Sequence, residues 1–252
     1  MKPTGLKGKV AVVTGASRGL GEAMAVALAA EGARVALVSR SADHLDRVAG
    51  QIAAAGGEAA AFVTDVGRDE QVKQAEARIL ARFRQVDILI NNAGLAARAH
   101  LTELTPEEWR AVLETNVTSA YLMCRSFVPH MKGRGYGRIL NVASVMASVS
   151  LPGRTAYSAS KSALLGFTRA LAQELAADRI TVNTISPGLF ATELARPIIE
   201  NPELLSQFLA NIPLNRPGQP EEIGQLAVYL CSEAAGYITG ADILIDGGWT
   251  AR

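Results

Sequence analysis

The sequence predicts an α/β fold in which helices cover both faces of a doubly wound, mostly parallel sheet. Three observations carry this prediction. Short apolar runs alternate with helical stretches, the runs are apolar on both faces, and a glycine-rich turn joins the first run to the first helix. Of the 252 residues, 49% are hydrophobic and 19% are charged. A chain of this length and composition can bury one large core, so we expect a single domain over residues 1–252.

The first half of the chain alternates four expected strands with four expected helices. Short β-branched or apolar runs predict the strands, and longer stretches with apolar residues at helical spacing predict the helices. Pro106 suits the first turn of the fourth helix, where its missing N–H removes no intrahelical hydrogen bond. The expected strands are 10–13, 34–39, 58–64 and 87–90, and the expected helices are 19–31, 43–55, 70–83 and 106–131.

The second half continues the alternation and adds one irregular insertion near 189–212. Pro197 and Pro202 interrupt its helical stretch, 193–210. The prolines and glycines at 213–220 mark a turn and not a linker between domains. The remaining expected strands are 137–142, 180–185 and 242–245, and the remaining helices are 155–177 and 221–231.

Composition argues against several classes of partner and site. Lys and Arg number 25 against 24 Asp and Glu, so no basic excess favours nucleic acid or an anionic membrane. No segment approaches the ~20 apolar residues that cross a bilayer, and the first residues do not resemble a signal peptide. We therefore expect a cytoplasmic protein. Cys124 and Cys231 are far apart and the three histidines are scattered, so we expect neither a disulfide framework nor a metal site.

A glycine-rich turn follows the first expected strand. Gly15, Gly19 and Gly21 stand in the run Thr14–Gly21, directly before the first helix. Glycines in this place let the backbone approach a pyrophosphate at a helix N-terminus. The spacing differs from Gly-x-Gly-x-x-Gly, and the loop by itself could also be only a tight turn.

The end of the second strand indicates which dinucleotide would bind. Sites that prefer NAD place an acidic residue here for the ribose hydroxyls, whereas an arginine accommodates the 2′-phosphate of NADP. This chain has Ser39 and Arg40 there, with Arg18 in the glycine-rich turn. Each arginine alone could be a solvated surface residue. The missing acid favours NADP(H), while NAD(H) stays possible.

Tyr157 and Lys161 are four residues apart on an expected helix and therefore share a face. A phenol has a pKa near ~10, and lowering it by about 3 units requires roughly 4 kcal/mol of differential stabilisation. The Lys161 ammonium and a bound cofactor in a poorly hydrated cleft can supply this. Ser144 lies thirteen residues upstream of Tyr157 and could hydrogen-bond the same substrate oxygen. Together these residues predict proton transfer at a carbonyl oxygen.

In its motifs the chain resembles the short-chain dehydrogenase/reductase family over nearly its whole length. Residues 14–21 match the family's Thr-Gly-x-x-x-Gly-x-Gly, 91–94 match Asn-Asn-Ala-Gly, and 157–161 match Tyr-x-x-x-Lys. Asn116, Ser144 and Pro187-Gly188 fill its remaining positions in the right order. The resemblance implies a Rossmann-type sheet of seven strands. It also implies an NADP(H)-dependent oxidoreductase that interconverts a ketone and a secondary alcohol by hydride transfer.

The resemblance further implies a role for each motif residue. Tyr157 would be the acid in reduction and the base in oxidation, Lys161 would lower its pKa and bind the nicotinamide ribose, and Ser144 would hold the substrate oxygen. Asn116 would bind a water that links Lys161 to bulk solvent; a local hydrogen bond is the ordinary role of such an Asn. The expected cofactor contacts are Gly15, Ser17, Arg18, Gly19, Leu20, Ser39, Arg40, Asp65, Val66, Asn92, Ala93, Gly94, Tyr157, Lys161, Pro187, Gly188, Phe190 and Thr192.

Loops at the carboxyl ends of the strands, 95–100, 145–154 and 189–211, should determine the substrate. Four apolar residues indicate a lid and three basic ones could meet a carboxylate or sugar hydroxyls, although exposed arginines are usually only solvated. The apolar residues are Phe190, Leu194, Ile198 and Ile199, and the basic ones are Arg98, His100 and Arg154.

Two branches of the family give faint further resemblances. The stretch 201–220 resembles gluconate 5-dehydrogenases, whereas Arg134, Arg138 and Arg179 resemble the carrier-protein face of 3-oxoacyl-carrier-protein reductases. Both substrates stay open at this point.

The family resemblance also implies a homotetramer joined through helices 106–131 and 155–177 and through the C-terminal strand and helix. Ala163, Leu164, Phe167, Leu171 and Leu175 recur at helical spacing and could equally belong to the core of one chain. An alternative of another class is a non-catalytic NADP-binding sensor or scaffold. Such a protein should have lost one of the four catalytic residues, and this chain retains all four.

Overall fold

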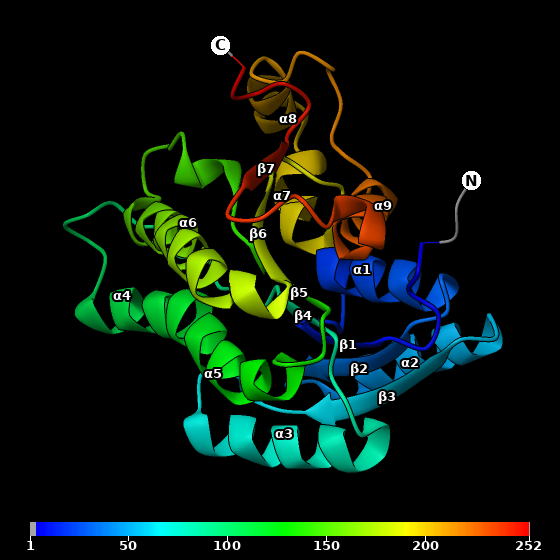
Figure 1. The fold of residues 1–252 in the computed structure, drawn as a ribbon. Helices are drawn as coiled ribbons and strands as arrows, with labels where there is room; N and C mark the ends of the chain where they lie inside the picture. Colours follow the sequence, from blue (N-terminus) through cyan, green and yellow to red (C-terminus); the bar gives the residue numbers. More distant parts are fainter. Residues whose placement is uncertain (1–3, 252) are drawn as a thin grey trace.

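In the computed structural model, which describes residues 4–251, seven strands form one parallel sheet (Figure 1). Their order is β3-β2-β1-β4-β5-β6-β7, and every neighbouring pair is parallel. The predicted Rossmann-type, doubly wound sheet is thereby confirmed. The strand order reverses between β1 and β4: the strands after β1 are added on one side of it, and β4 and those after it on the other. Sheets of this kind bind ligands in the crevice at this switch point. The strands are β1 Val10–Thr14, β2 Arg34–Ser39, β3 Glu58–Val63, β4 Ile88–Asn91, β5 Gly137–Val142, β6 Ile180–Pro187 and β7 Asp242–Ile245.

The helices lie close to their predicted ranges, with boundaries that differ by a few residues. They are α1 Gly19–Ala30, α2 Ala42–Ala54, α3 Asp69–Phe83, α4 Pro106–Leu113, α5 Ser119–Met131, α6 Thr155–Leu175, α7 Arg196–Ile199, α8 Pro202–Leu209 and α9 Pro220–Cys231. The expected helix 106–131 begins as predicted with Pro106 in its first turn, but a π-helical turn at Glu114–Thr118 separates α4 from α5. Such turns are rare and occur frequently at functional sites.

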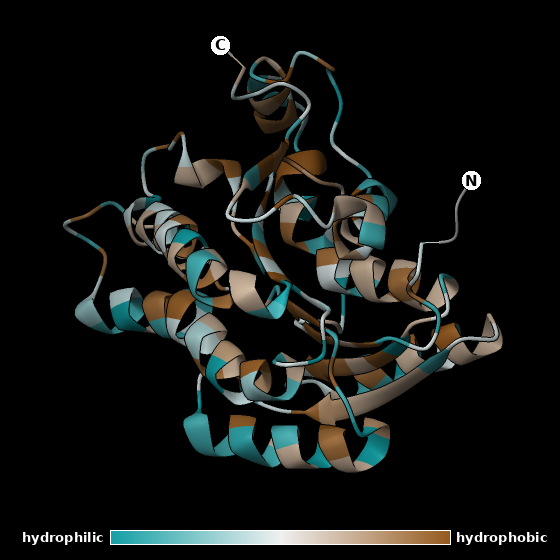
Figure 2. Ribbon diagram, viewed as in Figure 1, coloured by the Kyte–Doolittle hydropathy of each residue, from teal (hydrophilic) through white to brown (hydrophobic). Residues whose placement is uncertain are grey.

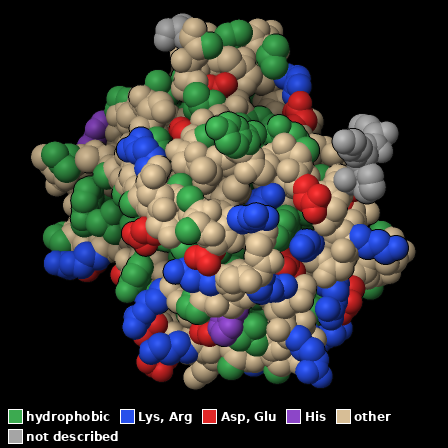
Figure 3. Space-filling view, viewed as in Figure 1, with side chains coloured by type: hydrophobic (Ala, Val, Ile, Leu, Met, Phe, Trp, Pro, Cys, Tyr) green, Lys and Arg blue, Asp and Glu red, His purple; other side chains and the backbone are tan. Residues whose placement is uncertain are grey.

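Helices cover the sheet on both faces because its strands are apolar on both faces. Ala11 and Val13 of β1 belong to a buried cluster with α1, α2 and α9, whereas Val10 and Val12 belong to a cluster with α3, α5 and α6. Figure 2 shows the strands mostly in brown, and polar residues on the outer surface of α3. Figure 3 shows Lys and Arg side chains interspersed with Asp and Glu over the visible face.

The insertion forms two short helices instead of one broken helix. Pro197 stands in the first turn of α7 and Pro202 in that of α8, so both prolines start helices. The Asn201 side chain caps α8 by accepting hydrogen bonds from the backbone N–H groups of Glu203 and Leu204, each at 3.1 Å. In Figure 1 the insertion lies near the top of the view, with α8 beside the C-terminal segment.

The contact between α1 and α9 depends on a helical glycine. A Cβ atom at Gly224 of α9 would lie 2.9 Å from the carbonyl oxygen of Ala23 and 3.0 Å from the Cβ of Ala27, both on α1. Gly50 of α2 is also helical, but a Cβ there would meet nothing within 4 Å. The two helical glycines therefore allow a controlled comparison, because alanine would clash at position 224 and would not at position 50.

We predict opposite effects on the free energy of unfolding. Gly224→Ala should destabilise by about 1–3 kcal/mol because α1 and α9 are forced apart. Gly50→Ala should stabilise by about 0.5–1 kcal/mol because alanine restricts the unfolded chain at no steric cost. Denaturant unfolding of both variants checks this, and a stabilising Gly224→Ala would contradict the close packing.

Candidate active site

A single cavity of about 790 Å³ extends along the carboxyl ends of the strands. It lies at the crevice where parallel sheets of this topology bind ligands. All of the residues predicted to contact the cofactor line it, from Gly15 in the glycine-rich turn to Thr192 in the insertion, and so does Ser144. Asn116 does not; its neighbour Thr115 does.

The glycine-rich turn is hydrogen-bonded to the residues at the end of β4. The Thr14 hydroxyl accepts hydrogen bonds from the backbone N–H groups of Asn92 (2.9 Å) and Ala93 (3.0 Å), and the Asn92 side chain donates to the carbonyl oxygen of Thr14 (2.9 Å). A Cβ atom at Gly21 would lie 2.3 Å from the Gly15 carbonyl oxygen, so only glycine fits. Asn92, predicted as a cofactor contact, thus also supports the turn by hydrogen bonding.

The predicted 2′-phosphate residues gather at one end of the cavity. Arg18, Ser39 and Arg40 line it together with His44 from the first turn of α2, which the sequence analysis did not select. Arg18 also forms an ion pair with Glu193 of the insertion, at 2.9 Å. Because both side chains are exposed, this pair is worth little, and a phosphate could replace the carboxylate.

Tyr157 and Ser144 meet at the other end of the cavity. Ser144 follows β5 in extended conformation, and its hydroxyl accepts a hydrogen bond from Met146 N at 3.2 Å. Burial raises the pKa of the Tyr157 phenol, while a hydrogen bond with Ser144 and the positive charge of Arg154 act in the opposite direction. The two hydroxyl groups therefore stand together in a poorly hydrated place, as proton transfer to a carbonyl oxygen requires.

Lys161 lies one helical turn beyond Tyr157 on α6 and is buried. Its ammonium donates a hydrogen bond to the Val142 carbonyl oxygen at 2.7 Å and lies 5.7 Å from the centroid of the Tyr157 ring. Burial lowers the pKa of Lys161 to about 8. In the chain alone, burial raises the pKa of the Tyr157 phenol more than the Ser144 hydrogen bond and the Arg154 charge lower it. The lowered pKa expected from Lys161 together with a bound cofactor stays a prediction.

Asn116 lies behind the cavity wall in the π-helical turn and is only 2% exposed. Its side-chain nitrogen donates to Leu95 O (2.9 Å) and to the Ser160 hydroxyl (2.8 Å), and its side-chain oxygen accepts from Leu95 N (2.7 Å). Ser160 in turn donates to the Tyr157 carbonyl oxygen at 2.7 Å. Asn116 thus joins the loop after β4 to α6, and both N–H donors of its amide are used inside the protein. The water relay implied by the resemblance stays a prediction.

An apolar cluster covers the end of the cavity near Tyr157. Ile198 of α7 and Phe208 of α8 line this end with Trp249, whose ring meets Phe208 edge-on at 5.8 Å between centroids. Of the residues predicted to form a lid, Phe190 and Ile198 are buried and line the cavity, whereas Leu194 lines it but is 69% exposed. Their action as a lid stays a prediction. Trp249 was missed because no local pattern connects it with residues some fifty positions earlier.

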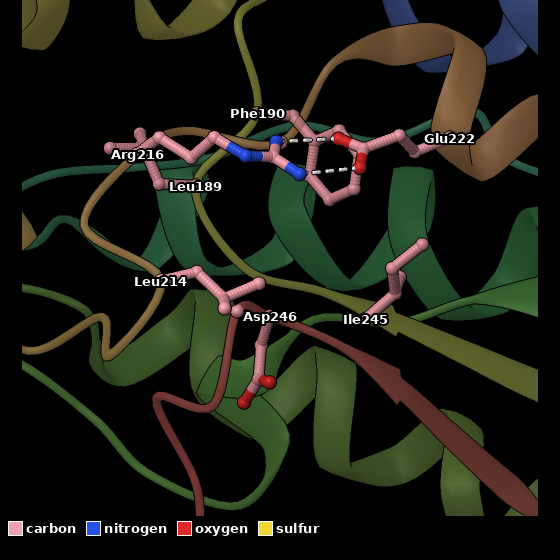
Figure 4. A pocket seen from close by; sticks show the side chains of 9 residues that line it. Leu189, Phe190, Leu214, Arg216, Glu222, Ile245 and Asp246 are labelled. Atoms are coloured by element: carbon pink, nitrogen blue, oxygen red, sulfur yellow. Dashed lines mark hydrogen bonds and ion pairs between the residues drawn. The ribbon is translucent and has the colours of Figure 1, made fainter.

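Arg216 of the turn at 213–220 lies beside Leu189 and Phe190 at the start of the insertion (Figure 4). It borders a small pocket of about 80 Å³, where Arg216 forms two hydrogen bonds, 2.7 and 2.8 Å, with the carboxylate of Glu222. Gly218 donates to Leu189 O at 2.9 Å and accepts from Ala191 N at 2.8 Å. A Cβ at Gly218 would lie 2.8 Å from the ring of Phe190. The turn therefore positions Phe190 in the cavity wall.

Of the three arginines that resembled a carrier-protein face, Arg134 and Arg138 bind groups within the chain, whereas Arg179 is exposed and its role stays a prediction. Arg138 is 4% exposed, and its guanidinium donates to the carbonyl oxygens of Ser232 and Gly137. Arg134 forms an ion pair with the buried Asp87 at 2.9 Å. The interpretation of Arg138 as a surface contact is therefore wrong: this arginine is part of the interior below β5.

Within residues 4–251 the structure contains neither a candidate metal site nor a helix suited to a membrane. No three histidine, cysteine, aspartate or glutamate side chains come together as they would around a metal ion. No helix in the described part of the chain combines the length and apolarity that crossing a membrane needs.

Comparison with known proteins identifies the family. A family model described as enoyl-(acyl carrier protein) reductase matches residues 15–250. The 3-oxoacyl-[acyl-carrier-protein] reductase of Synechocystis sp. is 40% identical over 247 residues, which cover 97% of this chain and 98% of that protein. The chain belongs to the short-chain dehydrogenase/reductase family. The predicted family and oxidoreductase class are thus confirmed.

Solved structures of sugar-acid dehydrogenase candidates are also similar to this short-chain dehydrogenase/reductase. One from Agrobacterium tumefaciens, a candidate gluconate dehydrogenase, has a TM-score of 0.97 at 35% identity and covers 100% of both chains. A candidate NAD(P)-dependent gluconate 5-dehydrogenase from Beutenbergia cavernae, with bound NADP, has a TM-score of 0.94 at 40% identity. That match covers 99% of this chain and 100% of the other.

The buried Lys161 should make folding stability depend on pH. Its pKa falls from 10.5 to about 8 on folding, so below pH 8 the folded state contains a poorly solvated ammonium. As pH rises from about 8 toward about 10.5 the folded state loses this proton first, and stability rises. Relative to Lys161→Met, the wild type should gain about 2 kcal/mol between about pH 7.5 and 9.5.

Denaturant unfolding at the two pH values measures this gain, with Lys73→Met as control. Lys73 is an exposed lysine on α3 that is paired with Asp69, so its removal should not reproduce the effect. Equal slopes for the wild type and Lys161→Met would refute the cost of burying this ammonium.

Proposed function

We propose that this protein is an NADP(H)-dependent oxidoreductase that interconverts a ketone and a secondary alcohol, with Tyr157 as the acid or base. One observation carries the proposal: the phenol of Tyr157, the hydroxyl of Ser144 and the ammonium of Lys161 line the same cavity as the glycine-rich turn. A hydride carrier bound along that turn would reach the place where the two hydroxyl groups converge. A sensor or scaffold would have no need of this arrangement.

The residues of the chain divide the chemistry between proton transfer and positioning. The nicotinamide, when bound, supplies or accepts the hydride at the substrate carbon. In reduction the π electrons of the C=O bond move to the oxygen, which takes the proton of the Tyr157 hydroxyl. Ser144 donates a hydrogen bond to the same oxygen and orients it. In oxidation the same proton travels from the substrate hydroxyl to the Tyr157 phenolate.

Lys161 would act on this step through charge and position. Its buried ammonium favours the phenolate form of Tyr157 electrostatically, and its N–H groups would bind the nicotinamide ribose hydroxyls. The charge of a bound oxidised nicotinamide would add to the same effect. This accounts for a phenol that becomes a useful base only in the assembled site.

Cofactor choice follows from the residues at the end of β2. Ser39 and Arg40 stand where an acidic residue would reject a phosphate, and Arg18 lines the same cavity, where its guanidinium is paired with Glu193 of the insertion. Guanidinium groups bind phosphate with charge-assisted hydrogen bonds. The NADP in the similar Beutenbergia structure supports the same choice here. We therefore propose NADP(H) as the preferred cofactor, with NAD(H) as a weaker substitute.

We propose a homotetramer in the cytoplasm as the working form. Large apolar side chains are exposed on the predicted contact elements: Tyr121 on α5, Tyr229 on α9 and Leu244 on the edge strand β7. Exposed apolar groups and an unpaired sheet edge favour contact with a second copy. Both cysteines are free and buried, in keeping with a reducing compartment. The molar mass measured in solution by light scattering tests the assembly.

Tyr157→Phe should abolish carbonyl reduction and leave NADPH binding nearly unchanged. The substitution removes the hydroxyl that transfers the proton and keeps the buried ring, so we expect a loss of at least about 100-fold in kcat. Nicotinamide absorbance follows the reaction and fluorescence titration follows binding. Full activity in Tyr157→Phe would overturn the proposed mechanism.

The Arg40→Asp substitution should weaken the binding of NADPH far more than the binding of NADH. The new carboxylate repels the 2′-phosphate, and the lost charge-assisted contact alone is worth about 1.5–3 kcal/mol, or on the order of 10- to 100-fold in Kd. Arg110→Asp on α4, at an exposed arginine paired with Glu107, is the control for a general change of charge. Equal weakening of both cofactors would contradict the assignment of the 2′-phosphate to Arg40.

A further inference from the structure

Two arginines from different loops face the part of the cavity that contains Tyr157. Arg98 lies in the loop after β4, and Arg154 lies just before α6, three residues ahead of Tyr157; both line the cavity. The loops themselves touch, since a Cβ atom at Gly153 would lie 3.7 Å from the backbone carbonyl oxygen of Ala99. The fold, and not sequence proximity, thus places the two arginines on adjoining loops that border the same cavity.

Neither guanidinium forms an ion pair with a carboxylate of residues 4–251. The carboxylates among the residues that line the cavity are Asp65, after β3, and Glu193, which is paired with Arg18. Arg154 is half-buried, and burial together with the charge of Arg98 lowers its pKa. Two cations held near each other without a counter-charge favour an anion from outside the chain.

The remaining walls of this end are apolar. The lining residues that belong to one apolar cluster with Tyr157 include Val145, Met146, Leu189, Ile198, Phe208 and Trp249. A chain of hydroxyl groups packed against these apolar side chains would lose its hydrogen bonds to water, because the polar partners at this end are limited to Ser144, Tyr157 and the two arginines. Hydrocarbon would be favoured against these side chains instead.

From this arrangement we infer that the substrate is an oxo acid, or the matching hydroxy acid, whose free carboxylate binds Arg154 and Arg98 while its otherwise apolar carbon chain packs against the insertion. The inference rests on the proposed function. The carboxylate would accept paired hydrogen bonds from a guanidinium, which fixes the orientation of the substrate. Its carbonyl group then lies against Tyr157 and Ser144.

The chemistry balances with the cofactor already proposed. The carbonyl carbon gains a hydride, which carries two electrons from NADPH, and the carbonyl oxygen gains the proton of Tyr157, which solvent restores. The products are the hydroxy acid and NADP⁺. The carboxylate takes no part in bond making, so its contribution is binding and orientation.

The experiment compares each acid with its methyl ester. The assay uses NADPH with 2-, 3- and 4-oxohexanoate and with the corresponding methyl esters. It compares the wild type with Arg154→Met, Arg154→Lys and Arg110→Met. Arg154→Met should lower kcat/KM for the preferred acid on the order of 10- to 100-fold and change the ester little. Arg154→Lys should recover part of the activity toward the acid, and Arg110→Met should match the wild type. NADPH affinity of each variant shows that the fold and the cofactor site are intact.

Other outcomes separate this inference from the proposed function. Equal losses for acid and ester in Arg154→Met would overturn carboxylate binding, as would a wild type that prefers esters. A clear preference of the wild type for a keto-aldonate or for a 3-oxoacyl thioester would overturn the apolar oxo acid in favour of that class. If the wild type reduces none of these carbonyl compounds, the proposed function itself fails.

Discussion

The site depends on one junction, the hydrogen bonds that join the end of β1 to the end of β4. These strands are neighbours in the sheet, yet the helices that follow them lie on opposite faces, so their ends diverge and leave a crevice. The backbone of the glycine-rich turn would have unpaired carbonyl groups there. The Asn92 side chain donates to two of them, on Thr14 and Gly15, and the Thr14 hydroxyl accepts two bonds from the backbone N–H groups of Asn92 and Ala93 after β4. These bonds hold the turn against the end of β4 from within the protein, and a Cβ atom at position 21 would clash with the Gly15 carbonyl oxygen.

A second constraint is the burial of the ionisable groups on α6. Tyr157 and Lys161 share a helix face, but burial acts oppositely on them: it raises the pKa of the phenol and lowers that of the ammonium. Both shifts disfavour the charged pair that catalysis would use. The folded protein therefore keeps both ionisable groups in an electrostatically unfavourable place. The packing of α6 against β6 and the hydrogen bond from Lys161 to the Val142 carbonyl oxygen hold them there. Strained electrostatics of this kind are typical of sites that act on a bound partner.

Motifs confined to one loop or to one turn of a helix could be predicted from the sequence, because their residues lie close together whatever the rest of the fold is. The glycine-rich turn and the pair Tyr157–Lys161 are of this kind. The alternation of strands and helices was equally local, and it gave the fold class. The π-helical turn around Asn116 was not predictable from periodicity, because a single widened turn hardly changes the pattern of apolar residues. The ion pair of Arg18 with Glu193 was not predictable either, since 175 positions separate the partners.

The arginines show most clearly why substrate recognition needs the structure. Arg138 and Arg154 are only sixteen residues apart, and in the sequence each could be a surface residue. The first begins a central strand, where its guanidinium finds the Ser232 carbonyl oxygen and is buried. The second precedes α6 at the opposite end of the sheet, where its neighbours are Arg98, Tyr157 and apolar side chains of the insertion. The two arginines therefore have different functions because they lie at opposite ends of β5. At the start of the strand, carbonyl oxygens of the protein bind the guanidinium of Arg138. Beyond its end, the guanidinium of Arg154 faces the cavity and is left to bind a ligand.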